Sequence, residues 1–166
     1  GVAVTDDNTL FEFIVLESAQ AGLSWKTILN KREGYRKAFK SFVPQKVAKM
    51  TQSDIDKLLQ NPNIIRNRLK ITSTITNAQA FLKIQKEFGS FSNYMWNWVN
   101  HKPIVNKHKD RSSVPATSEL AVTMAKDLKK RGFKFLGPTV WYAHMQAVGM
   151  VNDHTIDCFR HKEISK

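Results

Sequence analysis

Glu17 is the first residue in the chain that could do chemistry, because it lies on a mostly apolar helical stripe. Its neighbours about one turn away include Phe13, Ile14 and Ala21. Burying a carboxylate among such side chains costs free energy unless the carboxylate is paired or used. The pattern leaves two interpretations open: a functional carboxylate, or a structural glutamate at the edge of the stripe that is paired with a lysine or arginine.

A turn after this helix carries two large apolar residues, Leu23 and Trp25, beside the helix-breaking Gly22. Exposed apolar side chains at a turn can wedge into a base stack, and a tryptophan can stack on an extracted base. The alternative is that both side chains pack into the core, and the spacing alone favours that alternative.

A basic, glycine-bearing segment, residues 129–138, forms the second constellation, with the sequence KKRGFKFLGP. A tight turn between two helices presents backbone N–H groups at the start of the second helix, and these donors bind phosphate together with the helix dipole. Lys134 and the cations at positions 129–131 add positive charge. The paired glycines and the charge favour phosphate binding over an ordinary helical hairpin with a solvated basic end.

His154 and Cys158 have the i, i+4 spacing of two metal ligands on one helical face. His161 would continue that face. Two ligands do not complete the tetrahedral set of a structural zinc site. The spacing alone therefore favours a histidine near a helix end and a buried cysteine over a metal centre.

Helical periodicity dominates the chain and must position these residues. A capping box of Thr51 and Asp54 precedes one helix, and Asn61-Pro62 stops it. Gly132 ends another helix, and Pro138 opens the next one. Because no strand alternation is present, we expect an all-α fold in a single domain over residues 1–166. The further helices that we expect span residues 7–21, 64–87, 91–99, 117–131 and 138–149, with a polar loop over 101–115.

The composition indicates a protein that attracts polyanions. The chain has 26 Lys and Arg against 14 Asp and Glu, a net charge of +12. Nucleic acid is the first candidate partner. Membrane lipid is disfavoured, because no helix combines a basic face with a wide apolar face, and no apolar run reaches the about 18 residues of a membrane span. With no leader sequence and one cysteine, Cys158, we expect a cytoplasmic protein.

Several segments together resemble the 3-methyladenine DNA glycosylase I family, part of the helix-hairpin-helix glycosylase superfamily. The resemblance covers nearly the whole chain in order, and its most specific stretches are 20–25 and 130–137. It implies two helical lobes around a lesion pocket. It also implies a bacterial, monomeric enzyme that hydrolyses the N-glycosidic bond of N3-methyladenine in alkylated duplex DNA and releases 3-methyladenine. The segments that carry it are LFEFIVLESAQAGLSW (10–25), NIIRNR (63–68), WVN (98–100), LKKRGFKFLG (128–137) and GMVNDH (149–154).

The resemblance also assigns roles to single residues. Glu17 falls on the catalytic, base-binding glutamate of the family and Trp25 on its pocket tryptophan. Leu23 falls on the loop that fills the gap left by a flipped base. His154 and Cys158 match two members of the zinc-ligand set. The DNA-gripping hairpin falls on Arg131, Gly132, Phe133, Lys134 and Gly137.

The chain departs from the family pattern at its beginning. Family members carry an N-terminal segment that ends near Gly1 and supplies a cysteine, a histidine and a pocket tyrosine. We therefore expect a structural zinc that is incomplete or absent in this chain and a pocket that is open on that side. A second comparison concerns bifunctional relatives, which place a nucleophilic lysine where this chain has Pro138 and Thr139. Simple hydrolysis is therefore expected.

The mechanism implied by the resemblance depends on attraction between an anionic Glu17 and a cationic base. N3-methyladenine in DNA is cationic, so an anionic Glu17 would favour it over neutral adenine and could stabilise developing oxocarbenium charge. Asp153 is the rival base, but its neighbour His154 suggests a role near the zinc site instead. Two other functions stay open: a non-catalytic DNA-binding module, which would release no free base, and a bifunctional lyase, which borohydride would trap on abasic DNA.

Overall fold

The computed structural model describes residues 1–165 and is almost entirely helical, which confirms the all-α fold class. Two 3-10 turns, η1 (Lys40–Phe42) and η2 (Arg111–Ser113), and two short parallel strands, β1 (Ile104–Val105) and β2 (Val151–Asn152), complete the fold. The helices are α1 (Asp7–Gln20), α2 (Trp25–Asn30), α3 (Arg32–Ala38), α4 (Pro44–Val47), α5 (Gln52–Leu59), α6 (Arg68–Phe88), α7 (Phe91–Asn97), α8 (Glu119–Lys130), α9 (Pro138–Ala147) and α10 (Phe159–Glu163).

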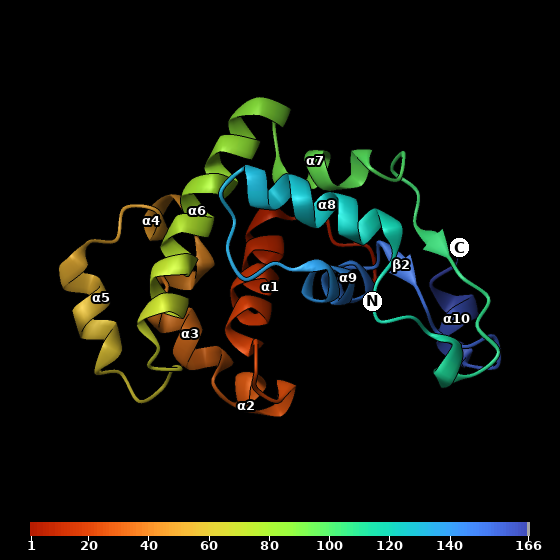
Figure 1. Cartoon of the computed structure of the whole chain (residues 1–166), viewed down its shortest axis with the longest axis horizontal. Coiled ribbons are helices and arrows are strands. Elements are labelled where there is room, and N and C mark those ends of the chain that lie inside the picture. Colours follow the sequence, from red (N-terminus) through yellow and green to blue (C-terminus); the bar gives the residue numbers. More distant parts are fainter. Residues whose placement is uncertain (166) are drawn as a thin grey trace.

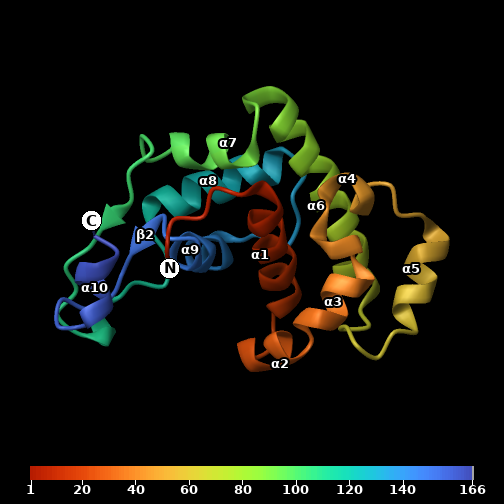
Figure 2. The same ribbon diagram turned by 180° about the vertical axis from the view of Figure 1, so that it is seen from behind.

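Helix α1 lies in the middle of the molecule. Helices α3–α6 lie on one side of it and α8–α10 on the other (Figure 1), and the view from behind shows the same division (Figure 2). Helix α1 contacts α2, α6, α7 and α9. Its buried residues therefore run almost continuously from Leu10 to Ala19. A helix that is apolar around most of its circumference is buried from several sides, as α1 is here.

The core is one cluster of buried apolar side chains that joins both sides of α1. Aromatic rings form its centre: Phe81 and Phe91 stack with ring centroids 4.2 Å apart, and the fully buried Trp141 meets Phe91 edge-on. Such pairs add about 0.5–1.5 kcal/mol each beyond the burial of their surface. No helix within residues 1–165 is long and apolar enough to cross a membrane.

Other helix ends differ from the predicted ones by one or two residues, whereas the start of α6 and the loop over 101–115 differ more. Helix α6 begins at Arg68 and not at residue 64, because Asn67 caps it by accepting a hydrogen bond from the Lys70 backbone N–H at 3.1 Å. Ile64 is buried in the loop before α6, so this apolar residue belongs to the core without being part of the helix. Inside the expected loop over 101–115, the Ile104 backbone N–H donates to the Met150 carbonyl at 2.9 Å. Strands of two residues are too short to show an alternating pattern.

Gly34 lies inside α3 at a point where the helix backbone touches the loop before α6. A Cβ on Gly34 would lie 2.8 Å from the Cβ of Asn63 and nearer still to its carbonyl oxygen. Gly34→Ala raises helix propensity by about 1 kcal/mol. We nevertheless expect it to lower the free energy of unfolding by about 1–3 kcal/mol, because the added methyl overpacks a backbone contact. Urea denaturation measures this.

The matched control for Gly34→Ala is Lys37→Ala, at an exposed position of the same helix. This substitution is expected to change the free energy of unfolding by less than about 0.5 kcal/mol. A Gly34→Ala variant that is more stable than the wild-type chain would contradict the close approach of α3 to the Asn63 loop.

Candidate active site

A pocket of about 410 Å³ lies where the C-terminal end of α1 faces the first turns of α9. This volume falls in the range of small-molecule binding sites. The pocket brings together two of the predicted site residues, Glu17 and Leu23. Its full lining is Glu17, Gln20, Ala21, Gly22, Leu23, Thr139, Val140 and Ala143.

Glu17 is 5% exposed. The acidic residue on the apolar stripe of α1 is therefore a buried carboxylate. Its partner is a histidine: Oε2 of Glu17 lies 2.8 Å from Nδ1 of His144, on α9. Within residues 1–165 no lysine or arginine forms an ion pair with Glu17. The alternative of a structural glutamate paired with a lysine or arginine is therefore wrong. The catalytic role of Glu17 stays a prediction.

The turn after α1 holds Leu23 and Trp25 at the surface. Gly22 has a φ of +77°, which only glycine adopts without strain, and Leu23 and Trp25 are 38% and 36% exposed. The alternative that both pack into the core is therefore wrong. Leu23 lines the Glu17 pocket, whereas Trp25, the first residue of α2, is not among the residues that line it.

Lys70 holds this turn in place, which the sequence analysis did not foresee. Its ammonium group donates hydrogen bonds to the carbonyl oxygens of Ala19 at 2.9 Å and Ala21 at 2.6 Å. A cation at the C-terminal end of a helix is also favoured by the helix dipole. Burial lowers the pKa of Lys70 below its usual range. Lys70 therefore fixes where α1 ends and where Leu23 emerges.

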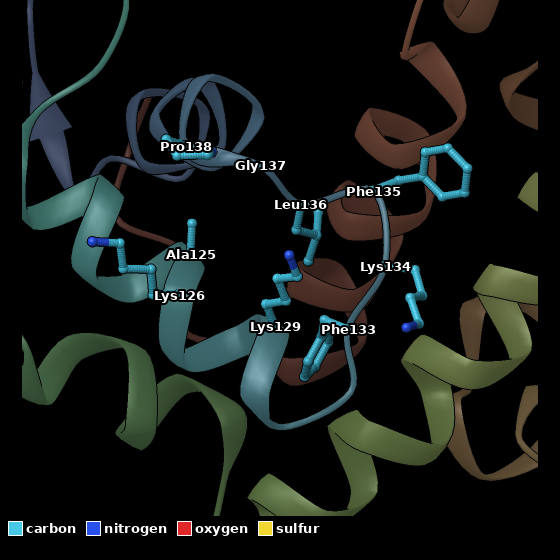
Figure 3. A pocket seen from close by; sticks show the side chains of 9 residues that line it. All are labelled: Ala125, Lys126, Lys129, Phe133, Lys134, Phe135, Leu136, Gly137 and Pro138. Carbon is cyan, nitrogen blue, oxygen red and sulfur yellow. The ribbon is translucent and has the colours of Figure 1, made fainter.

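The segment between α8 and α9 forms the predicted hairpin. Gly132 has a φ of +102° and Gly137 precedes the first residue of α9. A hollow of about 370 Å³ lies along the hairpin, and Figure 3 shows Lys126 and Lys129 on α8 and Lys134 on the turn around it. Three lysines around a hollow that reaches the N-terminus of α9 favour a phosphate there.

Asn77 of α6 clamps this hairpin at two points. Its side-chain Nδ2 donates to the Lys134 carbonyl at 3.0 Å, and its Oδ1 accepts from the Lys134 backbone N–H at 2.8 Å. Asn77 is 1% exposed. A buried amide that satisfies both backbone groups of one residue fixes the position of that residue and therefore of the turn. Sequence spacing carried no sign of it.

Two of the predicted DNA-binding side chains are engaged inside the protein. The Arg131 guanidinium donates to Asp127 at 2.6 Å and to Glu87 at 2.7 Å, and it lies over the ring of Tyr94. Phe133 is 3% exposed. These side chains attach the hairpin to its neighbours, which argues against a direct phosphate contact by either. The N–H groups of Gly132, Phe133 and Lys134 also bond other groups of the protein. The prediction of a phosphate contact is therefore narrowed to the backbone N–H groups of residues 135–137 and the Lys134 side chain.

Asp153, the rival base, is the acceptor of a closed hydrogen-bond cluster. Its Oδ2 accepts from Tyr142 at 2.6 Å and Gln146 at 2.7 Å, and its Oδ1 from Asn106 at 2.7 Å and His108 at 2.9 Å. Burial raises the pKa of Asp153, but these hydrogen bonds outweigh it and hold the pKa below its usual range. Asp153 does not line the Glu17 pocket. A carboxylate held in this way favours a structural role.

Comparison with known proteins now places the chain. The family model described as methyladenine glycosylase matches residues 1–161. The chain belongs to the methyladenine glycosylase family.

Members of this glycosylase family are similar to the chain over most of their length. The chain is 52% identical to the DNA-3-methyladenine glycosylase of Haemophilus influenzae over 92% of this chain and 83% of that protein. It is 47% identical to DNA-3-methyladenine glycosylase 1 of Escherichia coli over 95% of this chain and 84% of that protein. A solved variant of 3-methyladenine DNA glycosylase I in complex with 3-methyladenine superposes with a TM-score of 0.93 at 43% identity, over 96% and 86% of the two chains.

The two predicted zinc ligands, His154 and Cys158, lie close together, but they are not on a helix. Nδ1 of His154 lies 3.6 Å from Sγ of Cys158. The segment between them is not helical, because α10 begins at Phe159, and His161 instead bonds the Asn106 carbonyl at 2.8 Å. A cluster on one helical face is therefore wrong. Within residues 1–165 no group of three or more His, Cys, Asp or Glu side chains could hold a metal ion.

Removing the Asn77 clamp is expected to weaken DNA binding. Asn77→Ala leaves the Lys134 N–H and carbonyl without their partner, so the hairpin loses its fixed position. We expect the Kd for duplex DNA to rise about tenfold, which corresponds to the loss of one or two hydrogen bonds. Fluorescence anisotropy with labelled duplex measures this.

The control is Gln79→Ala on the same helix, whose amide bonds the Ala48 carbonyl at 3.2 Å, away from the hairpin. Its DNA affinity should equal that of the wild-type chain. Equal affinities for the Asn77→Ala and Gln79→Ala variants would show that the clamp does not control the hairpin.

Proposed function

We propose that this chain is a DNA glycosylase that hydrolyses the bond between N3-methyladenine and deoxyribose in alkylated duplex DNA. The observation that carries the proposal is the buried carboxylate of Glu17 in the wall of a 410 Å³ pocket, held by a histidine. A negative charge in such a pocket favours a cationic base over a neutral one. The names of the bacterial relatives, and the solved relative with 3-methyladenine bound, support the same substrate.

The surrounding residues have separate roles in the proposed reaction. The hairpin backbone and Lys134 grip phosphates beside the lesion, while the exposed Leu23 enters the gap that the extracted nucleotide leaves. Trp25 lies two residues further on, at the surface and outside the pocket lining, and its proposed role is to stack on the base as it leaves the duplex. Glu17 then contacts the cationic base and stabilises positive charge that develops on the sugar.

Hydrolysis is proposed rather than lyase chemistry. A Schiff base needs an uncharged lysine amine beside the sugar. The residues that line the Glu17 pocket include no lysine, and Thr139 occupies the position after Pro138 on α9. Borohydride treatment of the chain on abasic duplex should therefore trap no covalent complex.

Release of free base from methylated duplex DNA tests the proposal. The duplex is treated with a methylating agent and incubated with the chain, and the supernatant is analysed for 3-methyladenine by liquid chromatography. Release above the untreated rate supports a glycosylase. Tight DNA binding without any release would instead support a non-catalytic helix-hairpin-helix module.

Zinc, oligomeric state and location belong to the proposal as well. His154 and Cys158 are close enough to share one ion, and burial lowers the pKa of His154, which favours the neutral form that ligates metal. They supply part of a structural zinc site, which metal analysis of the purified chain tests. We propose a monomer in the cytoplasm of a bacterium, and light scattering measures its mass. No step of the reaction above uses the metal.

A further inference from the structure

His144 is a fully buried histidine next to the pocket, and the sequence analysis did not single it out. It is 0% exposed and lies on α9. Its ring stacks on Trp141, with centroids 4.6 Å apart, and meets Phe13 edge-on. Packing by two aromatic rings fixes the orientation of the imidazole.

The two ring nitrogens of His144 have different surroundings. Nδ1 lies 2.8 Å from Oε2 of Glu17, whereas Nε2 is buried and has no hydrogen-bond partner within residues 1–165. A proton on Nε2 would therefore be a buried donor without an acceptor, which proteins avoid more strongly than an acceptor without a donor. The surroundings of the ring therefore favour the neutral tautomer with its single proton on Nδ1 over the imidazolium and over the tautomer protonated on Nε2.

This tautomer also implies a charge for the pair. Nδ1–H donates to Oε2, so Glu17 is the acceptor and need not carry a proton of its own. Within residues 1–165 no hydrogen bond reaches Oε1 of Glu17. The pair therefore keeps the charge of one carboxylate and one free carboxylate oxygen in a pocket wall. A lysine or arginine in the same place would cancel that charge.

We propose that neutral His144 is a positioning residue that sets the specificity of this site for a cationic purine, by orienting Glu17 through one N–H and leaving its charge uncancelled. The inference rests on the proposed function and assigns a means of selectivity to it. The donor is an uncharged ring locked between aromatic side chains, so it holds the carboxylate without competing with the base for it.

Two substitutions of His144 separate the donor from the packing. Asn places its Nδ2 near the position of the imidazole Nδ1 and keeps a donor, whereas Phe keeps a flat ring and has none. Binding of free 3-methyladenine, which is neutral and reports how well the Glu17 acceptor is oriented, is measured by isothermal titration calorimetry near neutral pH. We expect His144→Asn to stay within about threefold of the wild-type Kd and His144→Phe to raise it about tenfold or more. The binding stoichiometry reports the folded fraction of each variant.

A spectroscopic measurement on the wild-type chain tests the same inference without any substitution. Nitrogen and carbon chemical shifts of the His144 ring should show the neutral tautomer protonated on Nδ1. The tautomer protonated on Nε2, or an imidazolium, would overturn the proposal. This readout holds even where the His144→Phe variant does not fold.

The outcomes also separate this inference from the proposed function. Wild-type binding of 3-methyladenine together with unchanged binding by His144→Phe overturns the role of His144 alone. Equal weakening of both variants at full stoichiometry overturns it too, because packing would then explain the loss. A wild-type chain that neither binds 3-methyladenine nor releases it from methylated DNA overturns both.

Discussion

Glu17→Gln is expected to lower the single-turnover rate of 3-methyladenine excision by about 10²–10³-fold, the size of effect seen when one electrostatic group is removed from a preorganised site. Glutamine has nearly the shape of glutamate and no charge. Its carbonyl oxygen can still accept the His144 N–H, but its amide then faces the pocket as a donor. The variant loses the attraction for the cationic base in DNA. It also loses the carboxylate acceptor that faces the pocket, so binding of the neutral free base 3-methyladenine weakens as well.

Single-turnover kinetics on methylated duplex measure this rate with DNA binding saturated. Affinity for undamaged duplex should stay unchanged, because the hairpin does not involve Glu17. The control is Glu33→Gln, which makes the same chemical change at an exposed position paired with Arg36 on α3. A Glu17→Gln variant that excises the base at the wild-type rate would refute the catalytic role of this carboxylate.

Local spacing predicted the parts of the site that lie close together in the sequence. Glu17 stood out because it interrupts an apolar stripe, and the turn after it because Gly22 ends the helix. The capping box of α5 also follows from spacing alone, and the Thr51 backbone N–H donates to Asp54 at 2.8 Å. Such features depend on hydrogen bonds and contacts within a few residues, which the order of residue types determines.

Contacts between distant segments could not be predicted in this way. His144 lies 127 positions after Glu17, and Asn77 lies 57 positions before Lys134. Nothing in the local pattern of α6 or α9 marks these side chains, because the pairing exists only once the helices pack together. The charge on the pocket wall therefore depends on a residue that the sequence analysis did not name.

Part of the pairing of Arg131 is visible in the sequence. Asp127 precedes it by one helical turn, and that spacing favours an ion pair on one face. Counting Arg131 as a phosphate ligand treated it as a free cation. The second partner, Glu87, lies 44 positions away and could not be foreseen.

Asp153→Asn is expected to lower the free energy of unfolding by about 2–4 kcal/mol, because hydrogen bonds to a buried charged group stabilise more than neutral ones. The carboxylate accepts two donors on each oxygen. Asparagine replaces one oxygen with an amide nitrogen, so one pair of donors then faces another donor. Chemical denaturation measures the change.

Tyr142→Phe is the matched control, since it removes one donor and leaves the Asp153 carboxylate with the other partners. Its expected cost is about 1 kcal/mol. The free energy of unfolding and the excision rate, compared between the Asp153→Asn and Glu17→Gln variants, separate the roles of the two carboxylates. If Asp153 is structural, its asparagine variant unfolds more easily but excises 3-methyladenine at a rate near that of the wild-type chain while folded. Glu17→Gln should show the opposite, with little change in stability and a large loss of rate. Rates in the reverse order would make Asp153 the base and Glu17 the scaffold, which would contradict the positions of the two carboxylates relative to the pocket.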